Sequence, residues 1–167
     1  LFPMPGLLVA TYREDGSPNA MTAAWTGACC HSPVCVGVAV RQSRQTYENI
    51  KRTQSFTLAV PRSSQSTAVD FLGIVSGKAD PEKMARAGLT TAPGTLVNAP
   101  LILECPVNVE CKLLHEVFLG THSYFIGEVM ETHVESAFLS DEGDIDIEKL
   151  DPLVYLTGVS EYRQIGP

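Results

Sequence analysis

The sequence predicts a mainly β protein with short helices, folded as a single domain around a closed β-barrel. Three observations support this fold class. Apolar residues occur in short runs bounded by Gly, Pro, Asn and Asp, which is typical of strands joined in hairpins. Few segments have helical spacing. The chain has 167 residues and a mass of 18.0 kDa, and no repeat or linker divides it, so we expect one domain over residues 1–167.

The first elements form a predicted hairpin. Residues 6–13, "GLLVATYR", are typical of a strand, and residues 14–19, "EDGSPN", have the Asp, Gly and Pro of a turn. Residues 19–30, "NAMTAAWTGACC", are expected to return as the second strand. This strand consists of small residues with polar and aromatic side chains at intervals. A strand that only filled a core would use Val, Ile and Leu instead.

A buried strand, a helix and a further strand follow. Residues 34–41, "VCVGVAVR", are continuously apolar, which is typical of a strand buried on both faces. Residues 43–53 have helical spacing, and Ser43 is placed to be the N-cap. Residues 55–61, "SFTLAVP", predict a strand that ends at Pro61.

The second half alternates two helices with long strands. Residues 66–77 predict a helix that ends in Gly, and residues 81–88 a short helix with Pro at its start and Gly after its end. Residues 101–117 and 121–135 predict two long strands joined by a turn, and residues 153–157 predict a last strand.

Charge and hydropathy exclude some classes of partner. The net charge is −7 and the pI about 5.0, which argues against general binding to nucleic acid or to an anionic membrane. The longest apolar runs have about ten residues, too few to cross a bilayer. The acidic run 141–151 lacks the closing Glu of a calcium loop, so we expect a solvated loop there.

The cysteines indicate a reducing compartment. There is no CxxC, and no Cys or His pairing has the spacing of a zinc site, so no metal is expected. Most cysteines lie in apolar, strand-like runs, where a free Cys acts as a small hydrophobe. Reduced thiols predict a cytoplasmic location. A redox pair of the adjacent Cys29 and Cys30 is the alternative, although it would close a strained ring. The full set is Cys29, Cys30, Cys35, Cys105 and Cys111.

Basic residues gather at the predicted junction of a strand and a helix. Residues 41–52 carry four of the twelve Lys and Arg residues and a single Glu. A first helical turn has free backbone N–H groups and the positive end of the helix dipole, both of which favour an anion. The Ser43 and Thr46 hydroxyls and the Arg41 guanidinium would complete a phosphate cradle. The alternative is an ordinary capped helix with solvated arginines.

Two familiar phosphate motifs do not account for this junction. The dinucleotide fingerprint G-x-G-x-x-G is absent. Residues 73–79, "GIVSGKA", have three residues between the glycines where a P-loop has four, and Ala where the magnesium ligand belongs. Lys78, which follows a flexible Gly77, is nevertheless a candidate second cation for the same phosphate.

Five segments form a pattern with a known counterpart. In order and spacing they resemble the flavin reductase-like FMN-binding family, and the similarity extends from about Gly6 to Leu156. The segments are "SPNAMTAAWTGACC" (17–30), "VAVRQSRQTYENI" (38–50), "DFLGIVSGK" (70–78), "VECKLLHE" (109–116) and "GTHSYFIGEV" (120–129).

The resemblance implies a Greek-key split β-barrel that dimerises and holds FMN non-covalently near the subunit interface. It also implies that NADH or NADPH reduces the flavin, which passes the electrons to free flavin or another acceptor. The cofactor carries such chemistry and the protein positions it, so no side chain is expected to be catalytic. The expected partners are a second copy of the chain, a nicotinamide nucleotide and an acceptor that the sequence does not identify.

The resemblance also answers why residues 19–30 are so small. Small residues allow a flat tricyclic ring to lie close along a strand, and backbone groups of 21–25 can meet its pyrimidine edge. The alternative for Trp25 is a core aromatic. The family pattern places Asn19, Met21, Thr22, Ala23, Ala24 and Trp25 at the flavin, Arg41, Ser43 and Thr46 at the phosphate, and Lys78 at the phosphate or ribityl chain.

His122 matches a "G-D-H" turn of the family, where the imidazole lies near the flavin or the incoming nicotinamide. Here Thr121 stands where many members have Asp, a departure that weakens the expectation of nicotinamide use. Two other functions stay open: an FMN-containing electron carrier without its own reductase activity, and a barrel that stores flavin or haem without turnover. A serine hydrolase has no support, because no G-x-S-x-G occurs.

Overall fold

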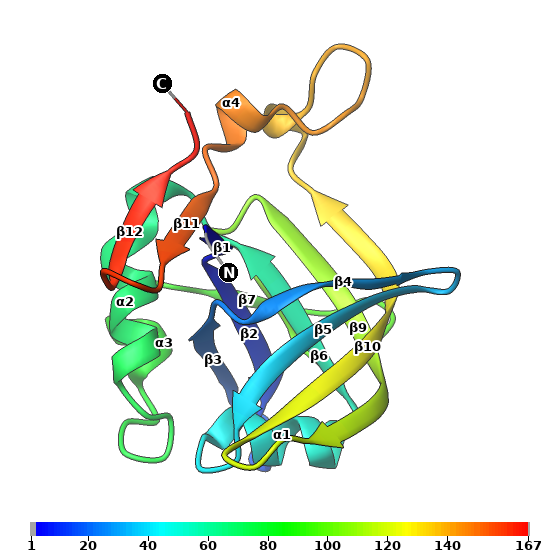
Figure 1. The fold of residues 1–167 in the computed structure, drawn as a ribbon, viewed down its shortest axis with the longest axis vertical. Helices are drawn as coiled ribbons and strands as arrows, with labels where there is room; N and C mark the ends of the chain where they lie inside the picture. The colour runs from blue at the N-terminus through cyan, green and yellow to red at the C-terminus, as the bar shows by residue number, and fades with distance from the viewer. Residues whose placement is uncertain (1–2, 167) are drawn as a thin grey trace.

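A computed structural model describes residues 3–166. At its centre a twisted sheet of seven antiparallel strands curls into a barrel, in the order β3-β2-β6-β9-β10-β5-β4 (Figure 1). The expectation of a closed barrel is wrong, because β3 and β4 are the two edges of this sheet and the barrel is split between them, as the resemblance implies. The strands are β2 (Leu7–Tyr12), β3 (Pro18–Ala23), β4 (Thr26–His31), β5 (Val34–Arg41), β6 (Ser55–Val60), β9 (Val107–Phe118) and β10 (His122–Val134).

Smaller elements surround the barrel. A three-stranded sheet, β1-β11-β12, and a two-stranded sheet, β7-β8, lie beside it, and α2 packs on the outside of β3. Helix α1 lies at one end, and α4 at the opposite end (Figure 1). The bounds are β1 Met4–Pro5, β7 Thr91–Pro93, β8 Pro100–Ile102, β11 Leu153–Leu156, β12 Glu161–Gln164, α1 Gln45–Thr53, α2 Ser66–Ile74, α3 Lys83–Arg86, α4 Ile147–Leu150, and short 3-10 turns at Ser63–Gln65 and Ser136–Phe138.

Two of the predicted strands are each divided. The segment 19–30 breaks at Ala24 and Trp25, where the chain passes from one edge of the sheet to the other edge. The segment 101–117 breaks after Ile102 because the Asn108 side chain holds a turn there. Its Oδ1 accepts from the Ile102 N–H at 2.8 Å, and its Nδ2 donates to the Ile102 carbonyl at 3.0 Å. The strands predicted at 6–13, 34–41, 55–61, 121–135 and 153–157 are confirmed.

The helix boundaries also need correction. Ser43 is not the N-cap of α1: the helix begins at Gln45, and Arg44 occupies the cap position without a capping side chain. Helix α2 ends at Ile74 rather than in Gly77, because side chains from elsewhere bind its last carbonyls. Arg44 donates to the Gly73 carbonyl at 2.9 Å, and Lys83 donates to the Leu72 carbonyl at 3.3 Å. The run 141–151, expected as a loop, contains α4.

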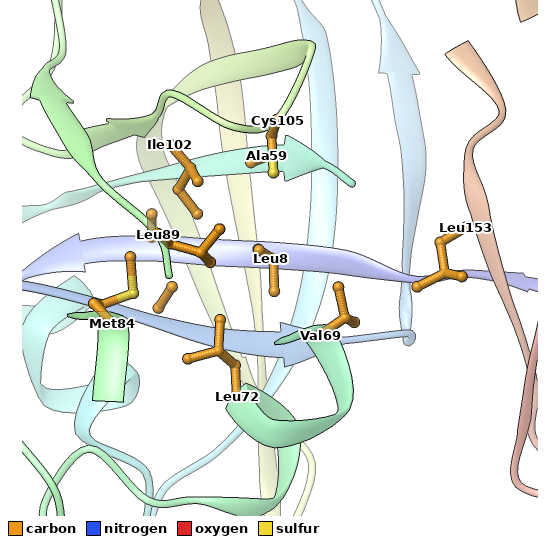
Figure 2. Close-up of a cluster of buried hydrophobic side chains, with 11 residues drawn as sticks. Leu8, Ala59, Val69, Leu72, Met84, Leu89, Ile102, Cys105 and Leu153 are labelled. Carbon is orange, nitrogen blue, oxygen red and sulfur yellow. The ribbon is translucent and has the colours of Figure 1, made fainter. Parts of the chain in front are cut away.

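The strands of the barrel have a core on each side. Leu8 and Ala10 of β2 face α2, whereas Val9 between them faces the barrel interior, and all three are buried. A strand covered on both faces explains the unbroken apolar run from Leu7 to Ala10. The outer core also includes Val69, Leu72, Met84, Ile102 and Leu153 (Figure 2). The inner core includes Val38, Val40, Ile50, Phe56 and Phe125.

Candidate functional site

A pocket of about 180 Å³ opens at the split in the barrel, between β3 and β5. Its walls come from β3, the connection to β4, the outer face of β5, the turn into α1 and the first residue of β10. The lining residues are Met21, Thr22, Ala23, Ala24, Trp25, Ala39, Arg41, Arg44 and His122.

Two aromatic rings form one wall of this pocket. The centroids of the Trp25 and His122 rings are 5.0 Å apart, with 40° between the ring planes. The Trp25 carbonyl accepts a hydrogen bond from the Ala39 N–H at 2.9 Å, which ties the β3–β4 connection to β5. Trp25 is 48% exposed, so the alternative of a core aromatic is wrong. A half-exposed indole beside a pocket is available to stack on a ligand.

The surroundings of His122 favour the neutral imidazole. Burial, and then the nearby Arg41 guanidinium, lower the pKa of His122. Its register partner across the β5–β10 ladder is Arg41, and its Nδ1 lies 3.0 Å from the Thr121 hydroxyl oxygen. The ring is therefore held beside the pocket by one short contact and carries little charge at neutral pH.

The basic side of the pocket lies at the start of α1. Arg41 is exposed at the end of β5, and Arg44 lies three residues further on. Because no side chain caps α1, the N–H groups of Gln45 and Thr46 keep their capacity for an outside acceptor, whereas the Tyr47 N–H donates to the Arg44 carbonyl at 3.2 Å. Arg41 and Arg44 line this end of the pocket, and α1 begins directly after Arg44.

Asn19 and Thr46 do not line the pocket but belong to a buried polar network. Each is 1% exposed, and the Asn19 Nδ2 donates to the Thr46 Oγ1 at 3.0 Å. The buried Arg13 guanidinium donates to the Gly77 carbonyl at 2.7 Å and to the Asn19 Oδ1 at 3.5 Å. These contacts join β3, α1 and the loop after α2 into one buried polar network.

Three other predicted residues have restricted roles. The Thr22 hydroxyl donates to the Val69 carbonyl, so its polar atom serves the contact with α2. Ser43 is exposed in the turn before α1. The exposed Lys78 forms an ion pair with Glu48 of α1, with 2.6 Å between Nζ and Oε1. Neither Ser43 nor Lys78 reaches the pocket lining.

The structure thus brings together seven predicted residues and adds two that sequence reasoning missed, Ala39 and Arg44. Both had a signal. Ala39 lies two positions from Arg41 on the same strand and therefore on the same face. Arg44 belongs to the basic cluster 41–52, but its position within that cluster does not distinguish it from a solvated arginine. The seven are Met21, Thr22, Ala23, Ala24, Trp25, Arg41 and His122.

A larger groove, of about 670 Å³, adjoins the pocket and shares Trp25 with it. Apart from the Trp25 and Tyr124 rings, its walls are small or flexible side chains. It runs from the start of β4 toward the turn between β11 and β12. The lining residues are Met4, Trp25, Thr26, Gly27, Tyr124, Thr157 and Gly158.

The residues present fit FMN in kind. Alanines and an aromatic wall suit a flat ring, and the uncapped helix start with two arginines suits a phosphate. The pocket is small, however, because its volume of 180 Å³ is below the roughly 300–1,000 Å³ of typical ligand pockets. The pocket of a single chain is therefore smaller than a typical ligand pocket.

Comparison with known proteins gives a consistent family assignment. Residues 1–166 match the family model described as "Flavin reductase like domain". The fold is similar to that of flavoredoxin of Desulfovibrio vulgaris (Miyazaki F), with a TM-score of 0.94, 38% identity and coverage of 100% of this chain and 89% of that one. Flavoredoxin from Methanosarcina acetivorans has a TM-score of 0.93 and 30% identity, covering 100% and 87%. An uncharacterised protein of Archaeoglobus fulgidus is 36% identical over 87% of this chain and 81% of its own length.

Proposed function

Because the chain belongs to the flavin reductase-like domain family, we propose that it binds FMN non-covalently at the barrel split and acts as an oxidoreductase. Electrons enter from NADH or NADPH and leave to free flavin or another acceptor. The observation that carries the proposal is that residues from separate sequence motifs converge on one pocket with an aromatic wall and a basic end. The thiols favour the reducing cytoplasm as the compartment.

Each part of the pocket has a distinct task in this proposal. The small residues of β3 and β5 leave room for a flat ring, and the Trp25 and His122 rings flank it. Arg41, Arg44 and the first turn of α1 neutralise the phosphate. Bound FMN supplies the two-electron chemistry, so the chain needs no general acid or base.

The groove beside Trp25 suits the nicotinamide donor. It is open, mostly apolar and continuous with the pocket through the indole. A planar nicotinamide ring lying there would come to the edge of the flavin site, and the low charge of His122 avoids repelling a cationic oxidised ring.

We also propose that the functional unit is a homodimer. The pocket is small in one chain, and exposed apolar side chains lie at the end of β9 and in the turn to β10: Val117, Phe118 and Leu119 are 43%, 67% and 61% exposed. The Leu119 N–H donates to the His122 carbonyl at 2.9 Å, so this apolar patch is fixed next to the pocket. A second copy that covers it would also deepen the pocket.

The FMN assignment is tested at Arg41, whose guanidinium would bind the phosphate. A hydrogen bond to a charged group contributes about 1.5–3 kcal/mol, so Arg41→Ala should weaken FMN binding roughly tenfold to a hundredfold. Riboflavin lacks the phosphate, so its weaker affinity should barely change. Arg163→Ala removes the same charge from exposed β12 and should leave both ligands unaffected. Equal losses for FMN and riboflavin would show that the phosphate does not lie at Arg41.

The enzymatic part is tested separately, by anaerobic reduction of FMN-loaded protein followed at the flavin absorption band. A reductase is bleached by NADH or NADPH. The likeness to two flavoredoxins favours a second function, an FMN-containing electron carrier, which would be bleached by dithionite only. A protein that cannot be loaded with FMN would contradict both functions.

A further inference from the structure

Three cysteines gather on one hairpin, outside the pocket residues. Strands β4 and β5 pair as a two-stranded ribbon that projects from the barrel (Figure 1). Cys30 of β4 lies directly opposite Cys35 of β5 in the register, and Cys29 occupies the irregularity between Ala28 and Cys30. The sequence alone points only to the adjacent pair Cys29–Cys30, because it does not reveal the register across the hairpin.

The opposition of Cys30 and Cys35 has the geometry that a disulfide needs. Directly opposed residues of an antiparallel ladder have Cα atoms about 4.5–5.5 Å apart and side chains on the same face. A disulfide spans Cα separations of about 4.4–6.8 Å. The ends of β4 and β5 are joined by only two residues, so closing the bond needs little rearrangement of the backbone.

The two thiols differ in access. Cys30 is exposed, whereas Cys35 is 3% exposed. Burial, followed by the nearby Cys30 and Cys29 thiols and Glu128, raises the pKa of Cys35, which places these groups close to it. An exposed thiol with a protected neighbour is the usual arrangement of an attacking and a resolving cysteine. The described residues contain no group of three His, Cys, Asp or Glu side chains suited to a metal ion, so metal binding is not favoured.

We propose that Cys30 and Cys35 form a reversible dithiol–disulfide site that reacts with low-molecular-weight disulfides. The Cys30 thiolate attacks one sulfur of the small disulfide and releases one small thiol, leaving a mixed disulfide. The Cys35 sulfur, after losing its proton, attacks the Cys30 sulfur, forms the Cys30–Cys35 bond and releases the second small thiol. The protein loses two electrons and two protons, and the small disulfide gains them.

This site shares a strand face with the candidate flavin pocket. Cys35, Gly37 and Ala39 alternate along β5 and therefore face the same side, and Ala39 lines the pocket. The Tyr124 ring covers Gly37 between them and lines the groove. The dithiol or disulfide of the hairpin therefore lies close to Tyr124, which forms a wall of the groove. The thiol chemistry itself does not depend on FMN binding.

The test uses the full-length protein with glutathione disulfide as the probe. After oxidation, free thiols are alkylated under denaturing conditions, and the tryptic peptide 14–41, which contains Cys29, Cys30 and Cys35, is analysed by mass spectrometry. The unmodified chain should lose two of its three alkylation sites in this peptide and regain them after dithiothreitol. Cys29→Ser should still form the internal bond, whereas Cys30→Ser, an exposed substitution that spares the core, should not.

Several outcomes would overturn the proposal. One is retention of all three alkylation sites in excess glutathione disulfide, and another is a stable glutathione adduct without an internal bond. A disulfide within the peptide that still forms in Cys30→Ser would show that Cys35 pairs with Cys29 instead of Cys30. A cross-linked dimer on a non-reducing gel would show that the thiols pair between chains.

Discussion

At the scale of single residues, Glu110 is a fully buried carboxylate that organises a loop. Its oxygens accept hydrogen bonds from the backbone N–H groups of Thr95, Leu96 and Val97 at 2.8–2.9 Å. His133 pairs with the same carboxylate, with 2.6 Å between Nε2 and Oε1. Burial raises the pKa of Glu110, but the hydrogen bonds from His133, Thr95 and Leu96 outweigh it and lower the pKa to about 2.

This carboxylate should control stability in acid. Its pKa is lower in the folded state than the ordinary 4.5, so its contribution is complete above pH 4.5 and is lost as the pH falls toward 2. The loss in the free energy of unfolding should be about 3 kcal/mol. Glu110→Gln should remove most of this dependence in urea titrations from pH 7 to 2. Glu48→Gln, at an exposed position of α1, should keep it. An unchanged acid profile in Glu110→Gln would contradict the assignment.

Lys83 should also make stability rise with pH, in the basic range rather than the acidic one. It is 1% exposed, and burial, followed by Arg44 and Arg13, lowers its pKa from 10.5 to about 8. Between these values the unfolded chain holds more protons than the folded one, so the free energy of unfolding should rise with pH, by up to about 3 kcal/mol. Denaturant titrations from pH 8 to 10 should show the rise. It should vanish in Lys83→Met and persist in Lys112→Met, an exposed control. A rise that survives Lys83→Met must come from another group.

At the scale of elements, the β4–β5 hairpin depends on two facing glycines with different surroundings. Gly27 and Gly37 are register partners. A Cβ at Gly37 would lie 2.1 Å from the Tyr124 hydroxyl oxygen, whereas a Cβ at Gly27 would meet nothing within 4 Å. The missing side chain at Gly37 therefore lets the Tyr124 ring pack against β5, where Tyr124 lines the groove.

Replacing each glycine by Ala should show that only Gly37 needs the missing side chain. Gly37→Ala must displace the Tyr124 ring, so we expect a loss of about 1–3 kcal/mol in the free energy of unfolding, typical of overpacking. Gly27→Ala should change it by less than about 0.5 kcal/mol, as at most open surface positions. Thermal and urea unfolding measure both. Equal effects of the two substitutions would contradict the packing of Tyr124 on Gly37.

At the scale of the whole molecule, the shallow pocket and the apolar β9–β10 turn should make assembly and flavin binding interdependent. Phe118→Glu places a charge in the proposed dimer interface, so sedimentation should show an 18.0 kDa species, and FMN affinity should fall roughly tenfold or more. Ile147→Glu, on exposed α4 at the opposite end, is the matched control (Figure 1). A native chain that sediments as a monomer and binds FMN tightly would contradict the dimer.

The helices described between residues 3 and 166 include none with the length and hydropathy to span a membrane. The candidate pocket lies at the split of the barrel.

The sequence by itself determined the strand content and much of the pocket. Period-two and continuous apolar patterns are local, so the main strands could be placed, and Met21–Trp25 stand together because they are consecutive in the chain. Motif resemblance added Arg41 and His122. Local patterns alone cannot establish that these two residues converge on Trp25, because they come from separate strands.

Only the tertiary structure decided which residues face each other. The strand register places Cys30 opposite Cys35. Long-range packing places Arg44 against the end of α2 and buries Asn19 and Thr46 away from the pocket lining. The tertiary structure also shows that the barrel is split, because the chain crosses from one edge of the sheet to the other at Ala24 and Trp25. The physical reason is that these contacts join segments distant in sequence, whereas propensity and periodicity report only on neighbours along the chain.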